Sequence, residues 1–298
     1  MGNEMMDDIH RDLNSEDWKI RRFRAQRMDW TPTSEHVEIG LNDKYWETRA
    51  AWVKRMDWTP TKKQIERGLN DSYWLVRKKW AERMDWTPTP EQIENGLVDK
   101  HWWVRKKWAM RTGWTPTPEQ VERGLNDDDS DVRTAWIRRM DWTPSREKIE
   151  KGLDDWYDDV RSAWAMRMDW TPTPEQVERG LLDDECGIRT IWALRMDWTP
   201  TPKQVKRGLD DTDDDVREAW AKRVDWTPTR KQVERGLVDV WNVRAAWVKR
   251  IDWTPTSEQI ESGLRDHSSE VRDAWVERLK MEQEKLMLDD HGLLGSSL

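Results

Sequence analysis

The sequence is almost without cysteine and has few aromatic residues other than tryptophan. Cys186 is the one cysteine among 298 residues, which excludes an intrachain disulfide and favours a reducing compartment, so we expect the cytoplasm. One Phe and three Tyr stand against 25 Trp, so a core has to be built on tryptophan. Long apolar runs are absent too: none approaches the roughly 20 residues that span a bilayer. The polar segment MGNEMMDDIH does not resemble a targeting peptide.

The motifs of catalysis are lacking as well. The sequence has no Gly-rich phosphate loop, no nucleophile elbow and no zinc-ligand spacing, and its five histidines are scattered. We therefore expect a protein that is not an enzyme, with no catalytic residue, cofactor or metal. Acidic neighbours should raise the pKa of the Cys186 thiol and reduce its reactivity.

An excess of charge of one sign is also missing. The chain carries 51 basic and 59 acidic residues, for a net charge of −8, which describes a mixed surface. Such a balance differs from the strongly basic composition of proteins that bind nucleic acid by charge alone.

What the sequence does contain is an internal repeat. Trp-Thr-Pro occurs nine times, at intervals of 28 residues except for a last interval of 27. A fixed period of this size predicts a solenoid, in which each repeat packs on its neighbours. We expect an all-α solenoid of about nine 28-residue, two-helix repeats over residues 18–279. Residues 1–17 are expected to form an N-terminal cap, and residues 280–298 a C-terminal cap helix and a polar tail.

The first helix of a repeat, helix A, is predicted by its capping residues. In the repeat of residues 114–141, Thr117 is a good N-cap, Pro118 suits the first helical position, and Gln120 completes a capping box. Gly124 is expected to end this short helix as a left-handed cap.

The second helix, helix B, is predicted by apolar residues that share one helical face. It should run over about residues 131–140 and end before the next Trp-Thr-Pro, because the residue before proline leaves helical geometry. The face consists of Val132, Ala135, Trp136 and Met140.

Aspartate and arginine recur at a fixed spacing. An Asp lies six residues before an Arg, as in Asp43 and Arg49, and a second Arg follows six residues later, as in Arg55. Identical charges at equal places in stacked repeats repel one another. We therefore expect charge-assisted hydrogen bonds between Asp and Arg of adjacent repeats.

These residues carry a resemblance to known repeats. The order Val-Arg-x-x-x-Ala-x-x-x-x-x-Thr-Pro, then a short helix, Leu-x-Asp and Val-Arg, resembles the leucine-rich repeat variant over residues 18–279. The Asp–Arg spacing of six is similar to that of HEAT repeats. The resemblance implies a right-handed helical solenoid that binds other macromolecules. The chain differs in its longer repeat and in its Trp at many Leu positions, and one Cys cannot hold the iron–sulfur cluster that a member of the group carries.

The repeats differ most in the segment that enters helix B, where we expect specificity. The first three repeats are aromatic there, and the second and third continue with paired lysines. This predicts an exposed aromatic and basic sector that binds a partner, made of Tyr45, Trp46, Tyr73, Trp74, Lys78, Lys79, Trp102, Trp103, Lys106 and Lys107. The later repeats predict an acidic sector that orients a basic partner, made of Asp128, Asp129, Asp131, Asp158, Asp159, Asp213, Asp214 and Asp215.

Alternatives remain open at this level. A protein partner is favoured, but stacked aromatics beside lysines also suit single-stranded nucleic acid, and the same residues suit self-association or the covering of helix ends. Two irregularities break the repeat. Thr112-Gly113 replaces Met-Asp, where we expect a bend or hinge, and a one-residue deletion before Arg244 should disturb stacking.

Overall fold

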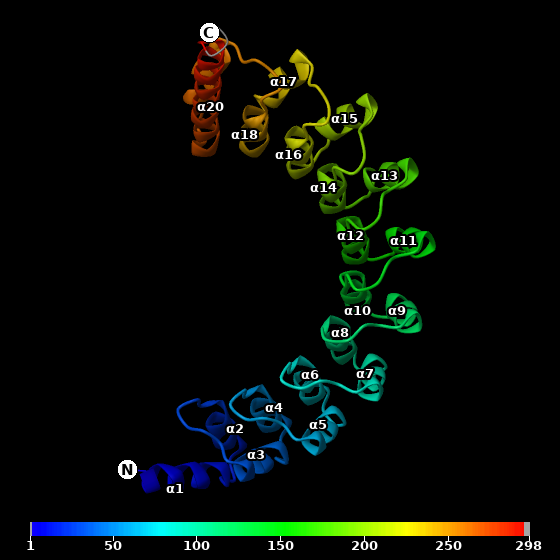
Figure 1. The fold of residues 1–298 in the computed structure, drawn as a ribbon, viewed down its shortest axis with the longest axis vertical. Coiled ribbons are helices and arrows are strands. Elements are labelled where there is room, and N and C mark those ends of the chain that lie inside the picture. The colour runs from blue at the N-terminus through cyan, green and yellow to red at the C-terminus, as the bar shows by residue number, and fades with distance from the viewer. Residues whose placement is uncertain (1, 295–298) are drawn as a thin grey trace. The chain divides into compact units, whose positions relative to one another are not determined.

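The structure, a computed structural model, describes residues 2–294 of the chain, and the side chains of residues 8–284. Within that range the secondary structure is entirely α-helical (Figure 1). The chain divides after Thr143 into two compact units, each described here by itself. Unit 1 contains α1 (Gly2–Leu13), α2 (Trp18–Gln26), α3 (Ser34–Leu41), α4 (Trp46–Lys54), α5 (Lys62–Leu69), α6 (Trp74–Glu82), α7 (Pro90–Leu97), α8 (Trp102–Met110), α9 (Pro118–Leu125) and α10 (Ser130–Ile137). Unit 2 contains α11 (Arg146–Leu153), α12 (Asp158–Met166), α13 (Pro174–Gly180), α14 (Cys186–Leu194), α15 (Pro202–Leu209), α16 (Asp214–Lys222), α17 (Arg230–Gly236), α18 (Trp241–Lys249), α19 (Ser257–Leu264) and α20 (Ser269–Leu294).

From α3 onward the helices alternate between two kinds. The odd-numbered A helices each pack on the B helix that follows, and each B helix packs on the next B helix of its unit. The described residues thus form nine A–B pairs, repeat 1 being α3 with α4 and repeat 9 being α19 with α20. Each unit is a stack of such pairs, so the predicted all-α solenoid is confirmed.

The A helices begin where the capping residues predict. Thr117 Oγ1 accepts a hydrogen bond from the Gln120 amide at 3.3 Å, and Gln120 Oε1 accepts one from the Thr117 amide at 3.0 Å. Both bonds of a capping box are therefore present at α9. The predicted start of helix A is confirmed.

The repeated glycine does not end helix A, and its predicted role as a left-handed cap is wrong. Gly124 lies inside α9, and Gly113 is the one described glycine with a positive φ. A Cβ on Gly124 would lie 2.1 Å from Nε1 of Trp136, twelve residues later. Glycine is required because the B-helix indole packs directly on the backbone of helix A.

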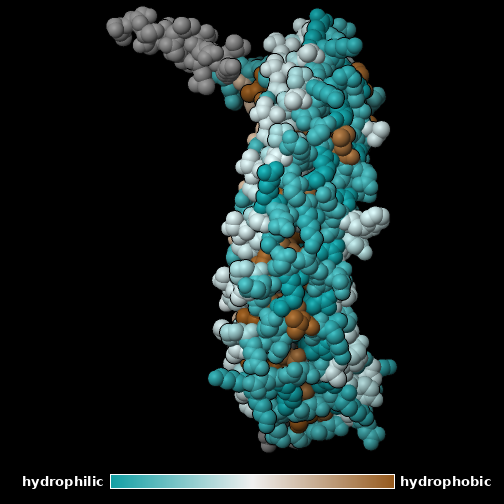
Figure 2. Space-filling view, turned by 90° about the vertical axis from the view of Figure 1, so that its right-hand side faces the viewer, coloured by the Kyte–Doolittle hydropathy of each residue, from teal (hydrophilic) through white to brown (hydrophobic). Residues whose placement is uncertain are grey.

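Tryptophan supplies the core in two sets. The B-helix tryptophans are at most 2% exposed: Trp52, Trp80, Trp108, Trp136, Trp164, Trp192, Trp220, Trp247 and Trp275. The Trp-Thr-Pro tryptophans pack edge-on against them, as Trp58 does against Trp80 with ring centroids 6.1 Å apart and an interplanar angle of 79°. On the face formed by the A helices, by contrast, hydrophobic residues form only scattered patches (Figure 2).

Helix B ends earlier than predicted. In repeat 4, α10 ends at Ile137, and Met140 lies beyond the helix with 65% of its surface exposed, so its assignment to the apolar face is wrong. Two residues beyond the end of α10, the side chain of an arginine reaches back to the preceding repeat. There Arg139 Nη1 donates to the carbonyl of Ala109 at 2.7 Å, and Nη2 to that of Trp114 at 3.1 Å.

Within each unit, the first arginine of a repeat forms the Asp–Arg ladder to the repeat that follows. Arg49 donates from Nε to Oδ2 of Asp71 at 2.6 Å and from Nη2 to Oδ1 at 2.7 Å, a bidentate pair with the following repeat. Its Nη1 donates to the carbonyl of Asp43 in its own repeat at 2.8 Å. The predicted bonds between adjacent repeats are confirmed.

The one-residue deletion leaves this ladder intact. Arg244 still reaches Asp266 in the next repeat, at 2.6 Å, and Arg217 still reaches Asp239, at 2.6 Å. Helices α16, α18 and α20 stack in sequence. The deletion shortens the loop before α18 only, and the predicted disturbance of stacking is wrong.

Within a unit, the second arginine of a repeat satisfies backbone carbonyls of the preceding repeat, as Arg83 does. Arg83 is 3% exposed. Its Nη1 donates to the carbonyls of Val53 at 3.0 Å and Arg55 at 2.7 Å, and Nη2 to that of Trp58 at 3.0 Å. Its Nε donates to Asp85 at 2.9 Å. This network closes the carbonyl end of each B helix against the next repeat.

Gly113 removes one partner from this network. It adopts a φ of +89°, and α8 and α10 on either side of it still pack together, so it makes a local turn in the chain. Arg111 takes the place of Arg83 here, and its Nε is buried without a hydrogen bond because Gly113 has replaced the aspartate. Burial also lowers the pKa of Arg111.

We expect the double substitution Thr112→Met/Gly113→Asp to be about 1–2 kcal/mol more stable than Gly113→Ala, because only the aspartate returns a charged partner to a buried guanidinium. Urea unfolding of the full chain measures this change. Gly113→Ala is the matched control: it offers no partner, and it carries the same strain of a side chain at a positive φ as the aspartate variant. Equal effects of the two variants would contradict this account.

The first and last described helices differ in how they join the stacks. Helix α1 packs on α2 and α3 and buries Ile9 and Leu13. At the other end, α20 begins as the B helix of repeat 9 and continues without a break through residues 280–294, the part predicted as a separate cap helix. Residues 295–298 of the predicted tail lie outside the described residues.

Candidate partner-binding surface

The segment that enters each B helix is held in place by the Asp–Arg ladder. Oδ1 of Asp71 accepts a hydrogen bond from the Tyr73 amide at 2.9 Å, while the same carboxylate binds Arg49 of the preceding repeat. Asp99 holds the His101 amide in the same way, at 2.9 Å. One carboxylate thus joins two repeats and fixes the turn that presents the variable residues.

The aromatic residues of the first three repeats stack on one another. Trp46 lies on Tyr73 with ring centroids 4.3 Å apart, and Trp74 lies on His101 at 4.1 Å. Trp102 lies on Trp103 at 4.4 Å. We call these six rings the aromatic ladder. Each is half-buried, so the structure brings the predicted aromatics together and covers much of their surface.

Two aromatic neighbours were missed by the sequence reasoning. His101 links Trp74 to Trp102, and Trp18 stacks on Tyr45 with centroids 5.7 Å apart. Tyr45 is 37% exposed. Both missed residues lie at, or directly next to, the position where the repeats differ. That variability was the sequence signal that could have revealed them.

The predicted lysines are paired within the protein. Lys78 and Lys107 lie 3.7 Å and 3.4 Å from carboxylate oxygens of Glu82, and Lys79 also binds Glu82. Lys106 binds Asp131 at 2.8 Å. Burial lowers the pKa of Lys78, whose ammonium lies 4.0 Å from the centroid of the Trp103 ring. Sequence reasoning missed Glu82, which its position three and four residues after two lysines could have revealed.

The predicted acidic residues divide into structural and exposed ones. Asp129 and Asp213 are the N-caps of α10 and α16, where their side chains accept backbone amide hydrogen bonds. Asp214 accepts a bond from Asn242 at 3.0 Å. The exposed members are Asp128, Asp158, Asp159, Asp214 and Asp215. Two of the predicted acidic positions, Asp129 and Asp213, therefore serve the fold.

Three exposed aromatic residues of unit 2 belong to the same variable segment. Trp156 is 90% exposed, Tyr157 50% and Trp241 52%. The predicted sectors did not include them, although they stand at variable positions. The difference between repeats was the available signal, but the sequence alone did not distinguish a stacked ring from an exposed one.

Cys186 has the predicted electrostatic setting. It is exposed, and a hydrogen bond and the charge of Asp213 raise the pKa of its thiol. The thiol is therefore a poor nucleophile at neutral pH. Among the described residues, no group of three His, Cys, Asp or Glu side chains is placed to hold a metal ion.

The fold and the ladders define the class of the protein: it is an α-helical repeat solenoid. The profile of a HEAT repeat associated with sister chromatid cohesion matches residues 257–279, which span α19 and the start of α20. A solved leucine-rich repeat variant, titled as having a novel repetitive protein structural motif, is 20% identical and covers 80% of this chain and 88% of its own, with a TM-score of 0.51. At 20% identity, this likeness shows the fold alone. That fold is the one that the sequence resemblance implied. No curated protein matches the chain.

None of the helices within residues 2–294 combines the length and the apolar character of a membrane-spanning segment.

Proposed function

We propose that this chain is a scaffold that binds another protein through the residues entering its B helices. A difference in burial carries the proposal. The tryptophans that recur at one place in the B helices are at most 2% exposed, whereas Trp156, at a variable position, is 90% exposed. An indole that gives this much surface to water supports an interface role, because Trp and Tyr are the commonest anchors of protein interfaces.

The charges beside this indole favour a basic partner. Asp158 and Asp159 follow Trp156 and Tyr157 directly, and both carboxylates are exposed at the start of α12. An apolar anchor flanked by carboxylates suits a hydrophobic residue next to lysines or arginines, with the charges setting orientation and association rate.

Nucleic-acid binding through the aromatic ladder is the weaker alternative. The ladder offers ring faces for stacking, but the lysines beside it already bind Glu82 and Asp131. A phosphate would have to displace these carboxylates or meet their repulsion, so the basic sector gives little net attraction.

The test is affinity purification of the tagged full chain from its native lysate, with and without nuclease, followed by mass spectrometry. We expect a protein partner that survives nuclease and whose recovery falls about tenfold with Trp156→Ala, because an anchor is lost. The melting temperature should stay unchanged, because Trp156 supports no part of the fold.

The matched variant is Trp74→Ala, which removes a ring of the aromatic ladder. It should lower the melting temperature, because Trp74 stacks on His101. Retention of every partner by Trp156→Ala would overturn the proposed surface. Loss of all partners on nuclease treatment would favour the nucleic-acid alternative. Recovery of untagged copies of this chain alone would indicate self-association.

A further inference from the structure

Adjacent A helices are tied by a contact that we call the Glu–Arg clasp. Between α3 and α5, Oε1 of Glu38 accepts a hydrogen bond from Gln64 Nε2 at 2.6 Å, and Oε2 accepts one from Arg67 Nη1 at 3.1 Å. The other clasps in the described residues are Glu94 with Gln120 and Arg123, Glu150 with Gln176 and Arg179, and Glu178 with Gln204 and Arg207.

The clasp has clear electrostatic consequences. The Arg207 hydrogen bond lowers the pKa of Glu178 to about 2. The same kind of partner lowers the pKa of Glu94. Each clasp glutamate is half-buried, because the glutamine and arginine of the next helix cover it.

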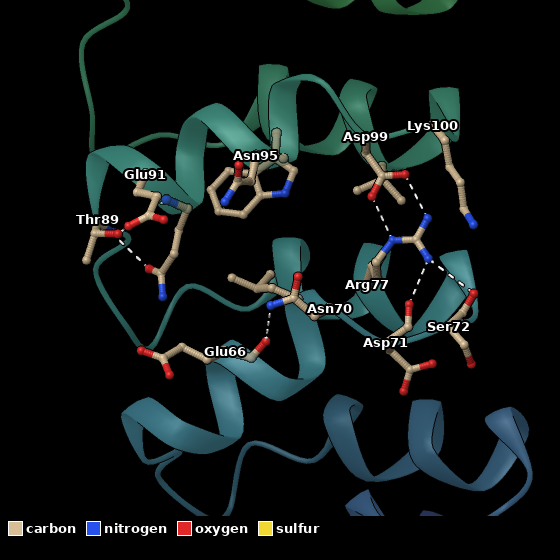
Figure 3. A pocket seen from close by; sticks show the side chains of 15 residues that line it. Glu66, Asn70, Asp71, Ser72, Arg77, Thr89, Glu91, Asn95, Asp99 and Lys100 are labelled. Atoms are coloured by element: carbon tan, nitrogen blue, oxygen red, sulfur yellow. Dashed lines mark hydrogen bonds and ion pairs between the residues drawn. The ribbon is translucent and has the colours of Figure 1, made fainter.

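Between α5 and α7 this clasp is missing. Asn95 occupies the place of the arginine, and Glu66, at the place of Glu38, is exposed and takes part in no ion pair among the described residues. A pocket of about 690 Å³ opens here, lined by both residues (Figure 3).

Two further pockets occur where the clasp is altered. Between α15 and α17, Lys206 replaces the glutamate, and a pocket of about 520 Å³ opens. Between α17 and α19, Ser262 replaces the arginine, and the pocket measures about 270 Å³. A pocket of about 630 Å³ also opens beside the clasped interface of α11 and α13, so the presence of a groove alone does not distinguish these places.

The three grooves differ in whether a glutamate is left without a cation. Lys206 binds Asp210 at 3.0 Å, so the second groove presents cations of its own. In the third groove, Glu234 binds Arg230 of the same helix at 2.7 Å. The groove between α5 and α7 differs from both, because its glutamate has no such partner.

The lining of the α5–α7 groove favours a cation with an apolar stem. Leu69 contributes apolar surface, and two carboxylates that form no ion pair among the described residues, Glu66 and Glu91, stand on the side of Thr89 (Figure 3). The unpaired ammonium of Lys100 lies at the opposite side. The remaining lining aspartates bind arginines: Asp71 binds Arg49 and Asp99 binds Arg77, each at 2.6 Å.

We propose that the groove between α5 and α7 binds an arginine side chain of a partner protein. The guanidinium would meet Glu66 in the place that Arg67 and Arg123 fill at the clasped interfaces, and the stem would lie on the apolar lining. Arginine is favoured over lysine, because its planar fork binds a carboxylate with two hydrogen bonds. This site lies between A helices of unit 1 and does not depend on the proposed interface at Trp156.

The test uses a fluorescent pentapeptide, Gly-Gly-Arg-Gly-Gly with both ends blocked, titrated into the full chain. We expect one binding site, and a dissociation constant at least about fivefold weaker for peptides with lysine or norleucine in place of arginine. Asn95→Arg restores the clasp and should weaken binding at least about tenfold, as should Glu66→Gln. Circular dichroism should show both variants folded, because arginine is the usual residue at this exposed position.

A variant that gains a peptide-binding site makes the test independent of the variants that lose binding. Arg123→Asn opens the clasp between α7 and α9 and frees Glu94, so the number of peptide sites should rise from one to two. Trp156→Ala should leave peptide binding unchanged, which separates this site from the proposed scaffold interface. Equal binding of arginine and norleucine peptides, or unchanged binding by Asn95→Arg, overturns the proposal.

Discussion

Gly180→Ala should destabilise unit 2 by about 3 kcal/mol, although it adds one methyl group. A Cβ on Gly180 would lie 2.1 Å from Nε1 of Trp192 and 2.3 Å from its Cδ1. Trp192 is 1% exposed and has no room to retreat, so the A helix has to move away from the B helix. Urea unfolding followed by circular dichroism measures the loss.

Gly187→Ala is the matched control for this prediction. Gly187 stands seven residues later, within α14, where an added Cβ would meet nothing within 4 Å. Alanine there should stabilise by about 0.5–1 kcal/mol through helix propensity. In the double variant Gly180→Ala/Trp192→Leu, the smaller side chain makes room for the methyl group, so the two losses should be less than additive. Similar effects of Gly180→Ala and Gly187→Ala would refute the packing argument.

Arg83→Met should cost about 3–5 kcal/mol, because it leaves buried polar groups without their partner. The guanidinium satisfies three carbonyls of the preceding repeat and lies 4.3 Å from the centroid of the Trp58 ring. Methionine fills much of the volume but donates no hydrogen bond. The free energy of unfolding in urea is the measurement.

Arg67→Met controls for the change of residue type. Arg67 binds Glu38, with side chains 36% and 45% exposed, so its loss should cost less than about 1 kcal/mol. Arg83→Lys should fall between the two, because lysine keeps the charge but lacks the planar fork that reaches several carbonyls. A loss at Arg67 as large as that at Arg83 would show that burial does not set the cost.

The fold was largely predictable because its determinants are local. Threonine and glutamine three residues apart define the start of helix A, and the helical spacing of Val132 and Trp136 defines helix B. The role of Gly124 was not predictable in this way. A helix-ending glycine and a glycine under an indole look alike in sequence, and only packing between the two helices distinguishes them.

The candidate surface was predicted in position but not in exposure. The variable positions do enter the B helices. The sequence cannot show, however, that Trp74 stacks on His101 whereas Trp156 is 90% exposed. The basic sector was overestimated for a related reason. Glu82 neutralises lysines of two successive B helices, and the approach of those helices depends on the stacking of repeats.

The aspartate of the Asp–Arg ladder bonds both to the preceding repeat and within its own repeat, so the repeats are structurally equivalent. Both carboxylate oxygens of Asp71 accept hydrogen bonds from Arg49 of the repeat before it, and Oδ1 also accepts one from the Tyr73 amide, which holds the turn of its own variable residues. A repeat moved to another place in the stack would bring the same acceptor for its predecessor and the same donor for its successor. The variable residues of one repeat can then be exchanged without altering the bonds between repeats, so the surface that they form can be changed one repeat at a time.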